Sequence, residues 1–90
     1  MSDKVNVTEI WSELTLLIKR AEGWWNQNRQ ASPSLRDYPQ YSRVRELGTL
    51  LSQTGGLPAM QEASQLVRVV CPTFGHTLDH MWHGIGDWRA

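Results

Sequence analysis

The longest regular pattern in the chain is a run of apolar residues at helical spacing between residues 7 and 28. Side chains three and four positions apart lie on one face of an α-helix, so apolar residues at these intervals predict a helix with one buried stripe. Asn6 with Glu9 has the composition of an N-cap and capping box. Leu16 interrupts the otherwise polar opposite face. The stripe consists of Val7, Ile10, Trp11, Leu14, Leu17, Ile18, Ala21, Trp24 and Trp25.

Three shorter apolar stripes follow, and prolines and glycines separate them. Proline suits the first turn of a helix but not its interior, and glycine adopts the left-handed conformation that ends many helices. The separating residues are Pro33, Pro39, Gly55, Gly56, Pro58 and Pro72. They predict helices near 7–28, 40–54, 58–70 and 74–84, with a connecting loop over 28–39. The stripe of the third helix is Met60, Ala63, Leu66, Val67 and Val70. Gly48 falls on the stripe of the second helix, which indicates that another backbone packs closely against it.

These patterns define a fold class. The sequence contains no strand-like alternation, internal repeat or low-complexity tract. Ninety residues are enough for one hydrophobic core and too few for two. We therefore predict an all-α fold, a compact bundle of about four helices, in a single domain over 1–90. Residues 1–5 are expected to form a disordered lead.

The charge balance favours no strongly charged partner. Nine Lys and Arg residues match nine Asp and Glu residues, which leaves a formal net charge of zero. Such a chain has no basic excess to attract nucleic acid or an anionic membrane, and little repulsion to oppose self-association. One cysteine cannot form an internal disulfide, and the chain contains neither a signal-like start nor an apolar run that spans a bilayer. We expect a soluble cytoplasmic protein of bacterial type, without membrane or nucleic-acid binding.

A helix over 74–84 would carry all three histidines on its polar face. His76, His80 and His83 are four and three positions apart, so their rings can approach one point, with Asp79 beside them. Neutral imidazole binds zinc, nickel or copper, and a carboxylate adds a ligand or orients a ring. A zinc or nickel site is therefore one hypothesis. A solvated face without any cofactor is the alternative, and we favour it because a single straight helix rarely supplies three ligands to one ion.

Two further hypotheses depend on fewer residues. Cys71 with His76 as its base has the composition of a hydrolytic pair. However, no glycine-rich anion cradle surrounds this thiol, so we prefer a buried structural role and assign no catalytic residue. The helices on either side of Gly55-Gly56 have the outline of a helix-turn-helix motif. A recognition helix reads bases with exposed Arg, Lys, Asn or Gln. The exposed face of this helix offers Gln61, Glu62 and Gln65, and Arg68 is its only basic residue, which argues against DNA binding.

Five tryptophans in ninety residues are the least ordinary feature of the composition. Each ring buries on the order of 150–250 Å², and a small helical core has difficulty enclosing all five. Trp24 lies at the edge of the first stripe, Trp88 follows the last predicted helix, and Leu16 lies opposite the stripe. Exposed aromatic residues on a neutral protein are typical of a protein–protein interface. Leu16, Trp24 and Trp88 form the predicted interface, most simply that of a homodimer, with another protein as the alternative partner.

Part of the chain resembles a group of small bacterial helical proteins for which no activity is established. The pattern is GG-x3-M followed by W-x-GIG-x-W near the C-terminus, and it covers roughly the second half of the chain. Its residues are Gly55, Gly56, Met60, Trp82, Gly84, Ile85, Gly86 and Trp88. The resemblance implies a compact helical fold and no particular mechanism.

Three functions follow from these patterns. The leading hypothesis is a non-enzymatic protein-interaction module that associates with itself. A metal-binding or hydrolytic protein that uses the His76, His80 and His83 face is the alternative. A small DNA-binding regulator is the third.

Overall fold

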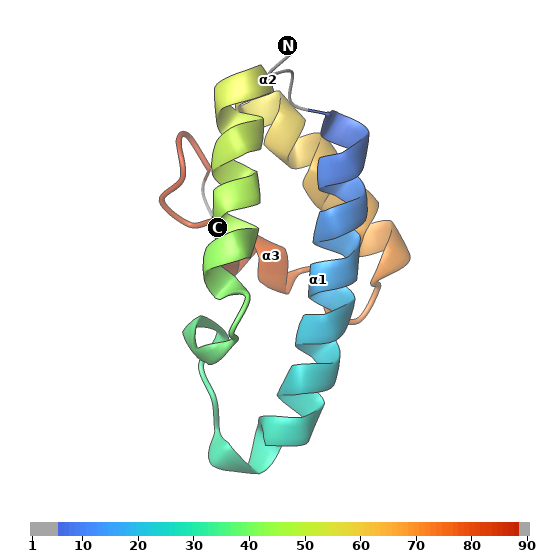
Figure 1. Cartoon of the computed structure of the whole chain (residues 1–90), viewed down its shortest axis with the longest axis vertical. Coiled ribbons are helices and arrows are strands. Elements are labelled where there is room, and N and C mark those ends of the chain that lie inside the picture. The colour runs from blue at the N-terminus through green and yellow to red at the C-terminus, as the bar shows by residue number, and fades with distance from the viewer. Residues whose placement is uncertain (1–5, 89–90) are drawn as a thin grey trace.

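The computed structural model describes residues 6–88, and every regular element within them is a helix (Figure 1). The elements are α1 (Val7–Asn28), η1 (Arg29–Ala31), η2 (Leu35–Asp37), α2 (Tyr41–Val70) and α3 (Thr77–Met81), the two η elements being short 3-10 helices. The predicted all-α class is therefore confirmed. The molecule is elongated and measures 45 × 24 × 23 Å. The expected disordered lead, residues 1–5, lies outside the described residues.

Helix α1 begins and ends where the apolar pattern predicts. The side chain of Asn6 accepts a hydrogen bond of 3.2 Å from the backbone N–H of Glu9, so one of the free N–H groups of the first turn has a partner. The helix then buries one stripe along its length. Its fully packed residues are Ile10, Leu14, Leu17, Ile18 and Ala21, with Trp11, Trp24 and Trp25 partly buried at the sides.

The two predicted helices near 40–54 and 58–70 are two arms of one element, α2, so the described residues contain three α-helices and not the four predicted. A kink at Gly56 separates the first arm, residues 41–55, from the second arm, residues 57–70. Gly56 has φ 67° and ψ −160°, a conformation that requires glycine. Pro58 then lies in the first turn of the second arm, where its missing N–H costs no helical hydrogen bond.

The last helix is shorter than the predicted range of 74–84. Helix α3 ends at Met81 because Gly84 and Gly86 both have positive φ angles, 91° and 54°, and turn the chain. These turns carry Ile85 and Trp88 back onto the body of the protein. The C-terminal segment, residues 71–88, thereby supplies much of the core, namely Cys71, Phe74, Leu78, Met81, Trp82, Ile85 and Trp88.

Trp82 lies at the centre of this core and is fully buried. Its indole Nε1–H donates a hydrogen bond of 2.9 Å to the carbonyl oxygen of Val44, and its ring lies against Gly48. A Cβ atom at Gly48 would be 2.5 Å from Trp82 Nε1. The predicted close approach at Gly48 is therefore present, but a tryptophan ring makes it and not a second backbone. Trp88 packs edge-on against Trp82, with ring centroids 5.1 Å apart.

Candidate functional site

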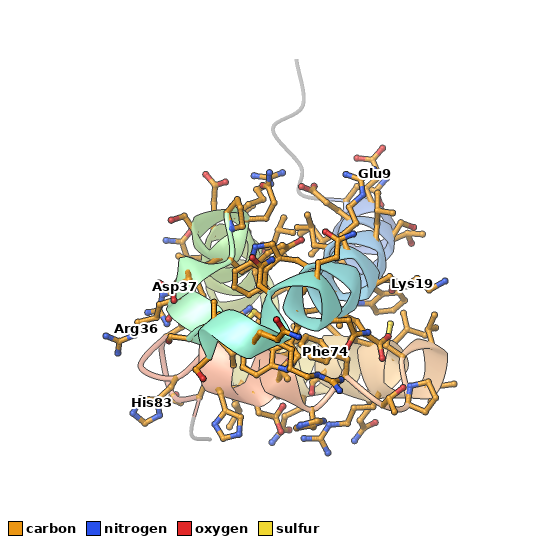
Figure 2. The ribbon with its side chains drawn as sticks, turned by 90° about the horizontal axis from the view of Figure 1, so that it is seen from below. Glu9, Lys19, Arg36, Asp37, Phe74 and His83 are labelled. Carbon is orange, nitrogen blue, oxygen red and sulfur yellow. The ribbon has the colours of Figure 1, made fainter. Side chains whose placement is uncertain are left out.

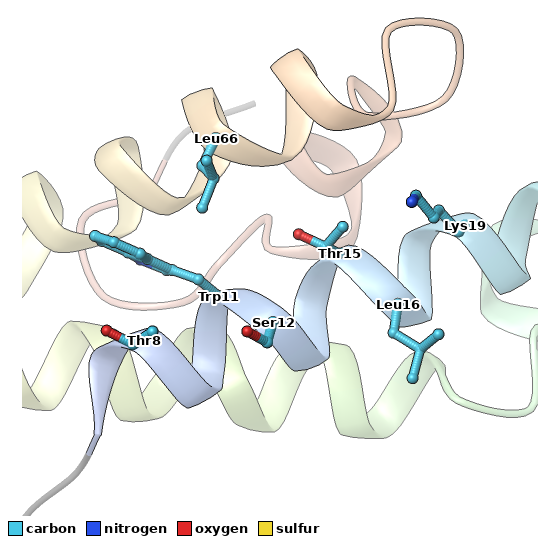
Figure 3. A pocket seen from close by; sticks show the side chains of 7 residues that line it. All are labelled: Thr8, Trp11, Ser12, Thr15, Leu16, Lys19 and Leu66. Carbon is cyan, nitrogen blue, oxygen red and sulfur yellow. The ribbon is translucent and has the colours of Figure 1, made fainter.

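A groove of about 440 Å³ runs between α1 and the second arm of α2 (Figure 3). Trp11 and Thr15 reach from α1 toward Leu66 on the second arm, and Leu16 lies at the outer edge, pointing away from Leu66. The lining residues are Thr8, Trp11, Ser12, Thr15, Leu16, Lys19 and Leu66. The groove is thus an apolar channel with small hydroxyl side chains on one wall and a single charged group, Lys19.

The second arm of α2 contributes an apolar stripe beside this groove. Ala63 and Val67 face the core, whereas Leu66, Val69 and Val70 lie at positions i, i+3 and i+4 on an adjacent face. Val69 is 78% exposed, Val70 is 40% exposed, and Leu16 on α1 is 47% exposed. We call Leu16, Leu66, Val69 and Val70 the apolar patch. The stripe predicted for this helix is therefore buried only in part, since Leu66 is partly buried and Val70 is exposed.

The end of the second arm lies directly beside α1. The Cys71 thiol is 4.0 Å from the carbonyl oxygen of Thr15, so Val70 and Leu16, the chain neighbours of these two residues, flank the same contact. Exposed apolar side chains therefore occur on both elements near this contact, although Leu16 points away from Leu66 (Figure 3). Contiguous exposed apolar surface is uncommon on monomeric proteins and marks interaction sites.

Trp11 adds an unpaired polar group to the groove. Its indole Nε1–H is buried and has no hydrogen-bond acceptor within residues 6–88. Leaving a buried donor unpaired costs about 1–3 kcal/mol. The Trp11 indole is therefore a groove residue whose buried N–H has no acceptor in the described part of the chain.

The predicted interface residues have three different environments. Leu16 is exposed at the groove, whereas Trp24 is partly buried, with ring centroids 5.6 Å from Tyr38 and 6.4 Å from Trp25. Trp88 is only 8% exposed, so the expectation of an exposed ring is wrong there. The turns at the C-terminal glycines fold it over the core, and its Nε1–H donates a hydrogen bond of 2.9 Å to the carbonyl oxygen of Asp79.

The three histidines are exposed, but the structure does not gather them around one point. Residues 6–88 contain no group of three or more His, Cys, Asp or Glu side chains that could hold a metal ion. His76 precedes α3 and His83 follows it, so the helical spacing assumed for the zinc or nickel site applies only in part. The carboxylate of Asp79 accepts a hydrogen bond of 3.0 Å from the Ser64 hydroxyl and forms an ion pair with Arg68. Residues 6–88 thus contain no cluster of side chains that supports the predicted zinc or nickel site.

The residues of the other two hypotheses have structural surroundings. Cys71 is buried, and burial raises the pKa of its thiol, which disfavours the nucleophilic thiolate. The second arm of α2 exposes Gln61, Glu62 and Gln65, and its basic residue, Arg68, is paired with Asp79. Neither a reactive thiol nor a basic recognition helix is therefore visible here.

The apolar patch is the feature that residue-by-residue reasoning located only in part. Leu16 could be found from its place opposite the α1 stripe, but Leu66 and Val70 match a core pattern in the sequence.

None of the helices in the described part is both long enough and apolar enough to cross a membrane. Comparisons with protein-family models, with curated proteins and with solved structures found no match to this chain.

Proposed function

We propose that this protein is a non-enzymatic interaction module that forms a homodimer through the groove between α1 and the second arm of α2. The exposed apolar patch carries this proposal. Leu16, Val69 and Val70 are the large apolar residues that are exposed within residues 6–88; Leu16 lines the groove, and the two valines follow the groove residue Leu66 on the second arm. Fully burying one such side chain stabilises a complex by about 1.5–3 kcal/mol. Pairing two copies covers the patch of each.

A second copy of the chain fits this surface better than a charged partner does. The groove contains one charged side chain, Lys19, and the whole chain has a net charge of zero. Long-range electrostatics therefore neither steers a charged partner to the groove nor separates two copies. In a two-fold dimer the same surface faces itself, and this is the commonest arrangement among soluble oligomers.

The surroundings of Cys71 support a cytoplasmic location. The cysteine is free and buried, as expected of a protein that works where thiols stay reduced. The alternative partner is another protein that presents an apolar helix to the same groove. A finding that the parent protein is monomeric would support this alternative.

Light scattering after size exclusion tests the dimer. At about 100 µM the parent protein should have twice the chain mass of 10.3 kDa, since a dimer is favoured by concentration. Leu16→Glu and Val69→Glu each place a charge in the patch and should shift the mass to that of the monomer. Both side chains are exposed, so the fold should survive.

The matched control is Gln53→Glu, which adds the same charge at an exposed position on the first arm of α2. It should leave the dimer intact. A monomeric parent protein at this concentration, or a Leu16→Glu variant that remains dimeric, would show that the groove is not a self-association site.

A further inference from the structure

A second surface of the molecule has a different chemistry. A cleft of about 670 Å³ lies where η2, the start of α2 and the C-terminal segment meet. Its lining residues are Ser34, Leu35, Arg36, Tyr41, Arg45, His80 and His83. None of these described residues is an Asp or Glu, so the lining contains two arginines and two histidines without a carboxylate. We call it the cationic cleft. Figure 2 shows Arg36 and His83 on one flank of the molecule, with Lys19 on the opposite flank.

Arg45 fixes the geometry of this cleft. Its guanidinium donates hydrogen bonds of 2.7 Å and 2.9 Å to the carbonyl oxygens of Met81 and His83, and it lies 6.0 Å from the centre of the Tyr41 ring. These contacts hold the turn after α3 against the first arm of α2. His80 and His83, which are far from Arg45 in sequence, therefore have defined positions beside it.

The local backbone increases the positive potential of the cleft. Tyr41 is the first residue of α2, and the first turn of this helix has no acidic residue and no side-chain cap from Gln40. The unpaired N–H groups and the helix dipole make such an end attractive to anions. Of the acids adjacent in sequence to lining residues, Glu46 is paired with Arg43, Asp79 is paired with Arg68, and the carboxylate of Asp37 accepts a hydrogen bond of 2.9 Å from the backbone N–H of Ser34. That carboxylate is thus already engaged in capping η2.

An aromatic hollow of about 440 Å³ adjoins the cationic cleft and shares Leu35 and His80 with it. The rings of Trp25 and Phe74 line this hollow, with centroids 6.2 Å apart and planes tilted by 55°. Glu22 and Arg29 are also among its lining residues, so one negative and one positive charge balance each other there. A polar cleft beside an aromatic hollow is suited to a ligand with one charged and one apolar end.

We propose that the cationic cleft and the aromatic hollow together bind a small organic anion. The carboxylate or phosphate group lies among Arg36, Arg45 and the two imidazoles, because charge-assisted hydrogen bonds from such donors are the strong ones. The aromatic body lies against Trp25 and Phe74. This site shares no lining residue with the groove, so it does not depend on dimer formation.

The test is an NMR titration of the full chain with phenyl phosphate, benzoate, inorganic phosphate and phenol. Phenyl phosphate should shift the Trp25 indole signal and the signals of His80 and His83 in a saturable manner. It should bind about tenfold more tightly than inorganic phosphate or phenol, since each of these fills only one half of the site. Comparing the affinity for benzoate with the affinity for phenyl phosphate then shows whether the cleft prefers a carboxylate or a phosphate group.

Four variants locate the site. The double variant Arg36→Gln with His83→Gln changes two exposed side chains and should weaken phenyl phosphate about tenfold or more. Phe74→Leu should weaken phenyl phosphate but leave inorganic phosphate unchanged. Lys19→Gln removes one positive charge from the opposite flank and should change the affinity less than twofold. Leu16→Glu should bind phenyl phosphate like the parent protein, whatever its oligomeric state.

Three results would overturn the proposal. The first is the absence of saturable shifts at His80, His83 and Trp25. The second is an equal loss of affinity in Lys19→Gln and in the double variant, which would indicate nonspecific attraction. The third is equal affinity for phenyl phosphate and inorganic phosphate, which would exclude the aromatic hollow from the site.

Discussion

Replacing Gly48 with alanine should destabilise the protein, although the same change normally stabilises a helix. Alanine is favoured over glycine within a helix by about 1 kcal/mol. Here, however, the new methyl group would lie 2.5 Å from Trp82 Nε1 and 2.7 Å from Cδ1 and Cε2 of the same ring. Nonbonded heavy atoms prefer a separation of about 3.5 Å, so the fully buried indole would have to move by roughly 1 Å.

The expected cost follows from what the ring would lose. Overpacking a core costs about 1–3 kcal/mol. Moving the ring also weakens its hydrogen bond to the Val44 carbonyl oxygen, which is worth about 0.5–1.5 kcal/mol. After the gain in helix propensity is subtracted, Gly48→Ala should lower the free energy of unfolding by about 1–3 kcal/mol.

Urea unfolding followed by circular dichroism measures this difference, at one fixed protein concentration because self-association would add to the stability. Gly23→Ala is the matched control. Gly23 also lies in a helix, but no atom beyond its own helix backbone and chain neighbours lies within 4 Å of the position of its Cβ, so alanine there should stabilise by about 0.4–1 kcal/mol.

The clash with Trp82 can be isolated further. In a Trp82→Phe background, Gly48→Ala should cost about 1 kcal/mol less than in the parent protein, because the smaller ring leaves room for the methyl group. A stabilising Gly48→Ala change in the parent protein would refute the close contact between these two residues.

Three further predictions concern separate parts of the fold. Leu14→Ala and Leu51→Ala remove side chains that are fully buried, so each should lower the free energy of unfolding by about 2–5 kcal/mol in denaturant titrations, and a loss below 1 kcal/mol would contradict their core position. The buried Cys71 thiol has a raised pKa, so a thiol reagent at pH 8 should modify it much more slowly in the native protein than in urea, and equal rates would contradict its burial. The Arg43 guanidinium, through its hydrogen bond, holds the pKa of the Glu13 carboxyl below its usual value, so this pair stabilises the fold above about pH 5 and the contribution is lost as the pH falls through the lowered pKa. Both groups are partly exposed, so Glu13→Gln should abolish a pH-dependent contribution of only about 0.2–1 kcal/mol, and an unchanged pH profile would exclude the pair as its source.

The elements of the fold could be predicted from local sequence because each depends on local chemistry. The spacing of Leu14, Leu17 and Ile18 along one stripe, together with the cap at Asn6, is sufficient to define α1. Gly56 likewise marks the kink, since its positive φ angle is difficult for other residues. The same periodicity predicted two helices here, and the structure has them as the two arms of α2 that meet at this kink.

The site was harder to predict because exposure depends on which elements pack together. Leu66 and Val70 have the spacing of core residues, yet Leu66 is only partly buried and Val70 is exposed in the folded chain. Trp88 shows the opposite case. It belongs to no apolar stripe in the sequence, but the turns at Gly84 and Gly86 fold it onto the core. His80 and His83 were noted for their own spacing, whereas their neighbours Arg36 and Arg45 belong to distant parts of the chain.

The dependence of the core on residues 71–88 has a consequence during protein synthesis. Helix α1 and both arms of α2 are translated before Trp82, Ile85 and Trp88, which cover their inner faces. The ribosome adds roughly 5–20 residues per second, so the last fifteen described residues take about 1–3 s to appear. During that interval the nascent chain exposes the apolar faces of its long helices, and a chaperone that holds such surfaces would have time to bind. Ribosomes stalled before residue 82 should therefore display an unfolded chain that is sensitive to protease. A chain extended by a C-terminal linker, long enough for residue 88 to leave the ribosome before stalling, should be protected.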